Sequence, residues 1–285
     1  MKLRSAILVL ALGCAPLAVP SGAPSAAAIA GTPAPFATGP DDYGPAFTPD
    51  GKTVYFTRRV NRRGAENIVV SHFRNGRWSE PQAAPFSGAA QDKEPFLSPD
   101  GKRLFFASTR DGGGRRSGFD LWFVERKNGA WSAPQKLDST VNSDAYDNYP
   151  AVSANGTLYF GSERPGGKGN VDLYRSRRVN GRYTAAENLG DAINTPYVEA
   201  DPYIAPDESF MIFCSTREGG FGEGDLYITY RRGTSWTPPV NLGSTINGPQ
   251  FDYTPLLSPD GKRFYWSRGW GGIYEIPARA LPREK

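Results

Sequence analysis

Short apolar segments alternate with turn residues along most of the chain after residue 41. Five segments share one pattern, in which an acid is followed three positions later by proline, then by a tight turn and a second apolar run. The five prolines lie 50, 55, 52 and 53 residues apart, and five copies with a period near 50 indicate a repeat architecture. The segments are DYGPAFTPDGKTVYF (42–56), DKEPFLSPDGKRLFF (92–106), DNYPAVSANGTLYF (147–160), EADPYIAPDESFMIF (199–213) and DYTPLLSPDGKRFYW (252–266).

Each copy predicts four strands. The first strand ends in a turn such as SPDG or SANG, and Asp-Gly and Asn-Gly favour hairpins because glycine tolerates positive φ. The second strand is apolar on both faces, which is typical of a strand between two packed layers. A glycine-rich loop leads to a third strand, as in DLWFVE at 120–125, and a second tight turn leads to the fourth.

In the first four copies the fourth strand carries an aromatic residue. In copies 1, 2 and 4 it also contains at least one proline. A proline fits an outer edge strand, where a missing N–H group is tolerated. We expect the aromatic side chains to pack between neighbouring units. They are Trp78, Trp131, Tyr183 and Trp236.

These strands predict an all-β, five-bladed β-propeller with four antiparallel strands per blade in a single domain at 31–285. The fifth copy lacks a fourth strand, but APFATGPDDYGP at 34–45 matches APFSGAAQDKEP at 84–95 in register. We therefore expect residues near 31–37 to pair with 272–276 and close the ring, which removes the open sheet edges. The expected blades are about 42–88, 89–143, 144–195, 196–248 and 249–282, the last completed by 31–37.

The first 30 residues are expected to be an export signal. Lys2 and Arg4 precede a short apolar run at 6–13, and Ala28-Ile29-Ala30 fits a signal-peptide cleavage site. A second interpretation is a lipoprotein signal ending at Cys14, because LALGC at 10–14 is similar to a lipoprotein cleavage box. The chain is thus expected to be exported, and either periplasmic or secreted, or alternatively lipid-anchored to the outer membrane.

The recurring D-x-x-P, SPDGK, F-x-S-x-R and DLY motifs resemble the TolB-type, WD-like β-propeller repeat of bacterial envelope proteins over about 42–276. The resemblance implies a propeller fold, an envelope address and binding to other envelope components. The protein after which the family is named has six blades behind an α/β domain, whereas this chain has five copies directly after the export signal. The resemblance therefore extends to the repeat family, and the Tol–Pal role is not carried over to this chain.

One acid and one arginine recur in each copy. The acid begins the innermost strand, and the arginine follows the second strand on the same face, so both sets should surround one mouth of the central channel. Two interpretations remain open: a belt in which each arginine bridges to an acid, or a polar mouth that binds a cation, a sugar or a peptide end. The acids are Asp42, Asp92, Asp147, Glu199 and Asp252, and the arginines are Arg110, Arg164 and Arg217, with Arg58 and Arg268 two positions earlier in their copies.

Glycine-rich loops on the same face carry three aromatic residues, Phe119, Phe221 and Trp270. Loops on a rigid scaffold are frequent binding sites, and an aromatic ring beside charged groups can stack on a sugar or anchor a peptide. Local packing within each loop is the alternative. We treat all three as candidate binding residues.

Catalytic and cofactor motifs are sparse. His72 is the only histidine, no G-x-S-x-G motif is present, and no cluster of histidine and cysteine suits a metal, so no cofactor or metal is expected. Cys214 lies in an apolar strand and is expected to be a buried thiol. A net charge of +4 does not indicate a nucleic-acid partner.

The pattern predicts a non-catalytic binding or scaffold propeller. It is expected to be a monomer and to recognise an envelope protein or a glycan through the loops around one channel mouth. The alternative is a five-bladed glycoside hydrolase or lyase that uses channel carboxylates. Two acids about 5–10 Å apart without arginine partners would favour the enzyme. Five acids that all bridge to arginines would favour the scaffold.

Overall fold

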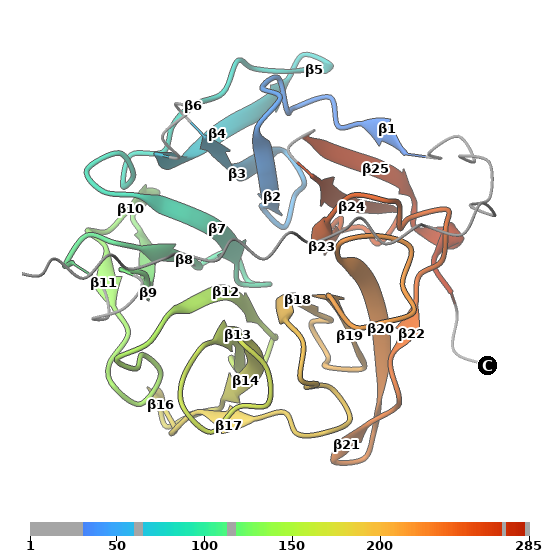
Figure 1. The fold of residues 1–285 in the computed structure, drawn as a ribbon. Helices are drawn as coiled ribbons and strands as arrows, with labels where there is room; N and C mark the ends of the chain where they lie inside the picture. Colours follow the sequence, from blue (N-terminus) through green and yellow to red (C-terminus); the bar gives the residue numbers. More distant parts are fainter. Residues whose placement is uncertain (1–30, 60–64, 113–117, 270–271, 283–285) are drawn as a thin grey trace, which may run out of the picture.

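Five small antiparallel sheets surround a central axis in the computed structural model, which describes residues 31–59, 65–112, 118–269 and 272–282 (Figure 1). The first strand of each sheet lies beside the axis, so the five-bladed propeller expected from the repeat is confirmed. In the described residues no helix is long and apolar enough to cross a membrane. The inner strands are β2 (Asp42–Phe47), β7 (Asp92–Leu97), β12 (Asp147–Val152), β18 (Glu199–Ile204) and β23 (Asp252–Leu257), which begin blades 1 to 5 in that order.

The second and third strands of each blade are largely buried, because each blade packs between two others. The second strands are β3 (Thr53–Arg59), β8 (Arg103–Ser108), β13 (Leu158–Ser162), β19 (Phe210–Ser215) and β24 (Arg263–Arg268). The third strands are β4 (Glu66–Arg74), β9 (Asp120–Lys127), β14 (Asp172–Ser176), β20 (Asp225–Arg232) and β25 (Ile273–Pro277), and a short 3-10 helix (Ala278–Ala280) follows β25.

The outer strand is split into two short pieces, where the sequence predicted one strand. In blade 1 both pieces pair with β4, and Pro81, which has no N–H group to donate, lies between them. In blade 3 the first piece instead forms a separate hairpin. The pieces are β5 (Arg77–Trp78) and β6 (Gln82–Ala83), β10 (Ala130–Trp131) and β11 (Gln135–Lys136), β15 (Arg178–Val179) with β16 (Arg182–Tyr183) and β17 (Glu187–Asn188), and β21 (Ser235–Trp236) and β22 (Val240–Asn241).

The N-terminal segment closes the ring as the sequence predicted. Strand β1 (Thr32–Pro33) is antiparallel to β25, and Thr32 lies opposite Glu275. The Ala34 N–H group then donates to the Ile273 carbonyl oxygen at 2.9 Å. The two ends of the described chain therefore complete one blade, and the edge of β25 is covered.

Aromatic side chains pack between blades, also as predicted. The Trp131 ring of blade 2 contacts Tyr55 and Phe86 of blade 1, and Trp236 of blade 4 contacts Tyr159 of blade 3. Cys214 is fully buried, and burial raises the pKa of its thiol well above the usual value. This confirms the expectation of a buried thiol.

Every inner strand has a bulge directly before its proline. The register shifts at this point in all five blades, and the residue before the proline has a positive φ. Such a conformation is uncommon for residues other than glycine. The residues are Gly44 (φ 62°), Glu94 (54°), Tyr149 (58°), Asp201 (51°) and Thr254 (47°), and together with their prolines they line the axis of the ring.

Candidate functional site

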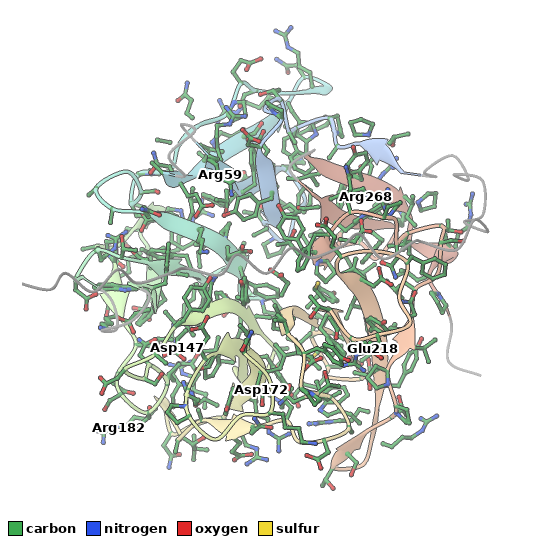
Figure 2. All side chains as sticks on the ribbon, in the orientation of Figure 1. Arg59, Asp147, Asp172, Arg182, Glu218 and Arg268 are labelled. Carbon is green, nitrogen blue, oxygen red and sulfur yellow. The ribbon has the colours of Figure 1, made fainter. Side chains whose placement is uncertain are left out.

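All five repeated acids pair with the arginines that the sequence singled out. The acid carboxylates are buried, and Figure 2 labels Asp147 and Arg268, members of two such pairs in different blades. The geometry matches the belt of ion pairs that was one of the two interpretations. The closest distances are 2.7 Å for Arg58–Asp42, 2.6 Å for Arg110–Asp92, 2.8 Å for Arg164–Asp147, 3.3 Å for Arg217–Glu199 and 2.6 Å for Arg268–Asp252.

The ion pairs have two geometries. In blades 2 to 4 a serine lies across the sheet from the acid, and the arginine two residues later donates to it, as Arg110 Nε does to Ser108 Oγ at 2.9 Å. In blades 1 and 5 the arginine takes the place of that serine, so Arg58 lies directly opposite Asp42. This explains the offset of two positions in the sequence.

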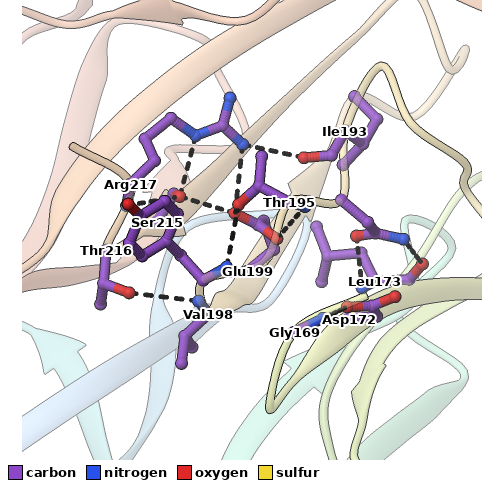
Figure 3. A network of polar contacts seen from close by, with 12 residues as sticks. Gly169, Asp172, Leu173, Ile193, Thr195, Val198, Glu199, Ser215, Thr216 and Arg217 are labelled. Atoms are coloured by element: carbon purple, nitrogen blue, oxygen red, sulfur yellow. Dashed lines mark hydrogen bonds and ion pairs between the residues drawn. The ribbon is translucent and has the colours of Figure 1, made fainter. Parts of the chain in front are cut away.

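Each pair also holds the segment that arrives from the preceding blade. Figure 3 shows this for blade 4, where Arg217 donates to the Ile193 carbonyl oxygen at 2.8 Å. Glu199 accepts the Thr195 N–H group at 2.7 Å and the Thr195 hydroxyl at 2.6 Å. Because residues 193–195 connect blade 3 to blade 4, the acid and the arginine together clamp adjacent blades.

The acid–arginine ion pair of the closing blade, Asp252–Arg268, is the most deeply buried of the five. Burial raises the pKa of Asp252 to about 6, although hydrogen bonds from Arg268, Gly248 and Trp266 oppose this shift. A raised pKa means that the ionised carboxylate is held at some cost in solvation.

A second group of charged residues lies on the channel axis and was missed by the sequence analysis. Glu94 and Asp201 both occupy the bulge position and are less than a tenth exposed, and the two carboxyl groups are close enough to influence each other's ionisation. Burial raises the pKa of Asp201 to about 7, and burial and the charge of Asp201 raise the pKa of Glu94 well above its usual value.

Other polar side chains surround this pair. The Lys93 ammonium donates to the Tyr146 hydroxyl at 3.0 Å and lies 4.3 Å from the centre of the Phe119 ring. The Phe119 ring also meets Tyr146 edge to face. Phe119, one of the predicted binding aromatics, therefore packs against its own surroundings in this structure.

The signal that could have found the carboxyl pair is a difference between the repeats. The motif D-x-x-P directs attention to the acid that every copy shares. The position directly before the proline instead varies among glycine, glutamate, tyrosine, aspartate and threonine. A position that varies within a regular repeat is where one blade can acquire a property that the others lack.

Phe221 projects from the loop between β19 and β20. It is 46% exposed, and its N–H group donates to Asp225 Oδ2 at 2.6 Å, which fixes the backbone beneath it. Tyr197 is 37% exposed on the same side of blade 4, and its interaction with Glu218 of that loop raises the pKa of its hydroxyl. Tyr197 was not among the predicted residues, while Trp270 and Cys14 lie outside the described residues.

Sequence comparisons identify no relative: no family model matches the chain, and no curated protein matches it. Solved structures do match in fold. TolB from Acinetobacter baumannii is 17% identical with a TM-score of 0.50, over 83% of this chain and 54% of that protein. This chain thus corresponds to about half the length of that TolB.

Two proteins named as enzymes match as well. An α-L-arabinofuranosidase from Lactobacillus brevis is 13% identical with a TM-score of 0.58, over 83% of this chain and 90% of that one. A gluconolactonase from Xanthomonas campestris is 13% identical with a TM-score of 0.50, over 85% and 86%. At identities this low, the structural matches establish only the fold, a propeller like that of TolB. The same fold serves different functions in different proteins.

Proposed function

We propose that this protein is a binding or scaffold propeller of the cell envelope, which recognises a protein or glycan partner through its loop face. The loop face is the side of the ring that carries the loops between second and third strands, including 216–224. The observation that supports this most directly is the exposure of Phe221 and Tyr197 on that face. Exposed aromatic residues commonly anchor partners at interfaces.

The loop that carries Phe221 is fixed before any partner arrives. Asp225 accepts the Phe221 N–H group, and a Cβ atom at Gly222 would lie 2.0 Å from the Gly248 carbonyl oxygen. Only glycine allows so close an approach to the segment that leads to blade 5. A ring held in place in advance loses little conformational entropy on binding, which favours affinity.

The alternative function, a glycoside hydrolase or lyase, is favoured by one observation, the Glu94–Asp201 pair on the axis. Its geometry argues against that chemistry. Glycosidases place two carboxyl groups about 5–10 Å apart with a sugar between them, whereas these two line a single small cavity. The cavity that they line measures about 30 Å³, which is room for one or two water molecules and not for a sugar ring.

The envelope address rests on the sequence alone. A basic start, an apolar run and a small-residue cleavage site in residues 1–30 support export, and Cys14 offers lipidation as the alternative. Labelling of producing cells with a clickable fatty acid distinguishes the two. Label on the wild type but not on Cys14→Ser identifies a lipoprotein, and an unlabelled, cleaved wild type identifies a secreted protein.

Site-specific crosslinking tests the binding role. A photoreactive amino acid at Phe221, introduced in the producing cells, should give a discrete adduct that mass spectrometry can identify. The matched control is the same amino acid at Val179, which is 53% exposed on the outer hairpin of blade 3. A glycan array with purified protein covers a sugar partner. The proposal fails if both positions give the same adducts, or if neither protein nor glycan is recovered.

A further inference from the structure

A pocket of about 490 Å³ lies between blades 2 and 3, away from the loop face. It opens on the turn face, the side that carries the turns between first and second strands. The turns 98–102 and 153–157, the end of β9 and the β15–β16 hairpin surround it. Its volume falls in the range of small-molecule sites.

The pocket carries an excess of positive charge. Five basic residues line it, namely Lys102, Arg103, Arg126, Lys127 and Arg178, against the acids Asp100 and Glu125. Both acids are already paired with cations of the pocket, Asp100 with Lys102 at 3.9 Å and Glu125 with Arg103 at 2.6 Å. The positive charge that remains is therefore not balanced within the pocket.

Arg178 and Arg126 are the two cations of the pocket without an ion pair in the described residues, and Arg126 lies over the Trp131 ring. Arg178 is half-buried, and it makes one hydrogen bond of 3.4 Å to the Gly181 carbonyl oxygen. No carboxylate lies within 4 Å of its guanidinium in the described part of the chain. A guanidinium has five N–H donors in a planar fork, so most of those on Arg178 are free for a ligand.

Tyr183 adds a hydroxyl group to the same place. This residue occupies the position at which blades 1, 2 and 4 have tryptophan. Its hydroxyl oxygen is buried and has no hydrogen-bond partner in the described residues. Burial raises the pKa of Tyr183 to about 12, while the charges of Arg103 and Arg178 oppose that shift, which places both guanidinium groups near the ring.

We propose that the pocket between blades 2 and 3 binds a phosphate monoester carried on a sugar-sized group, with Arg178 and Tyr183 as donors. Arginine forks match the geometry of phosphate oxygens, and the phenol O–H group donates to the same anion. Glu125 holds the guanidinium of Arg103, another lining residue, in place through two hydrogen bonds at 2.9 and 2.6 Å. This site is independent of the loop face and of the function proposed for it.

The corresponding pocket between blades 5 and 1 offers a contrast. It measures about 540 Å³ and is lined by Trp78 where the first has Tyr183. Its arginine, Arg263, is bound to Glu275 at 2.7 Å, and its Lys262 lies 3.6 Å from Asp260. The combination of a free guanidinium and a free phenol is thus a property of the pocket between blades 2 and 3.

Isothermal titration with glucose 6-phosphate, and with glucose as the uncharged probe, tests the proposal. We expect the phosphate ester to bind and glucose not to bind. Arg178→Gln should weaken binding at least tenfold, because it removes a charge-assisted contact. Tyr183→Trp should weaken it similarly, because it replaces the hydroxyl with the ring found in other blades. Arg182→Gln is the matched control, since Arg182 is exposed at the outer rim (Figure 2).

Vesicles identify the source of the phosphate. A lipid-borne phosphate is supported if the protein sediments with phosphatidic acid vesicles but not with phosphatidylcholine vesicles. Arg178→Gln should then lose this binding. Binding of glucose 6-phosphate alone would support a soluble one. The proposal is overturned if neither phosphate probe binds, if glucose binds as tightly as its phosphate, or if Arg178→Gln and Arg182→Gln bind like the wild type.

Discussion

Arg268 lies directly across the sheet from Asp252, with its Nε atom 2.6 Å from Oδ1 and its side chain only 3% exposed. The other four clamp arginines are 16–25% exposed. The blade that joins the two ends of the described chain therefore has the most deeply buried ion pair. Arg268 also donates to the Ile246 carbonyl oxygen of blade 4, so this arginine holds the closing blade to its neighbour.

Removing Arg268 should destabilise the protein strongly. Arg268→Ala leaves the Asp252 carboxylate buried without a cation, and loss of one partner of a buried pair costs about 3–5 kcal/mol. Urea unfolding measures the free energy. Arg263→Ala is the control, because the more exposed pair Arg263–Glu275 contributes about 1 kcal/mol or less. Equal losses for the two variants would show that the clamp does not hold the ring.

Stability should fall as the pH rises from about 4 to about 7. The pKa of Asp201 is about 7 in the folded protein and about 4 in the unfolded chain, so in this interval the folded state binds more protons. The stability that comes from protonation of Asp201 in the folded protein is complete below the lower pKa and lost above the higher pKa. Urea unfolding at several pH values measures this slope.

Asp201→Asn supplies the control for that slope. The variant retains the contributions of Asp252 and of the buried Glu94, which have the same sign, but it lacks that of Asp201, so its slope between pH 4 and 7 should be shallower than that of the wild type. An identical pH dependence in the wild type and in Asp201→Asn would contradict the raised pKa of Asp201.

Loss of the Phe36 side chain should open the ring. Phe36 is 1% exposed and packs against Phe56 of blade 1 and Tyr265 of blade 5. Truncation of a buried phenylalanine costs about 3–5 kcal/mol, so Phe36→Ala should lower the midpoint of thermal unfolding clearly. Phe221→Ala removes an exposed ring and should leave the midpoint nearly unchanged. A small effect of Phe36→Ala would mean that the N-terminal segment does not support the ring.

The sequence predicted the features that recur in every blade. The match between 34–45 and 84–95 located the closing strand, because aligned repeats occupy equivalent places in a ring. The acid and arginine partners could be named for the same reason. The burial of these ion pairs could not be predicted in the same way. It depends on contacts between two blades, such as that of Arg217 in blade 4 with Ile193 in blade 3, and the sequence of a single repeat does not contain them.

The carboxyl pair on the axis could not be derived from strand periodicity. Alternation assigns successive residues to opposite faces, but the bulge before each proline interrupts it and turns Glu94 and Asp201 toward the channel. Their proximity also joins blades 2 and 4, which only the closed ring brings together. The split outer strand was missed because, in blades 1, 2 and 4, a proline such as Pro81 interrupts the pairing although the chain continues along the sheet edge.

The most direct test of the binding role is the dissociation constant of the partner recovered by crosslinking at Phe221, measured with purified proteins. We predict that Phe221→Ala raises this constant tenfold or more, as for an interface anchor, while Val179→Ala leaves it unchanged and the partner remains chemically intact. Equal constants for both variants, or conversion of the partner to a product, would contradict a non-catalytic loop-face binding protein.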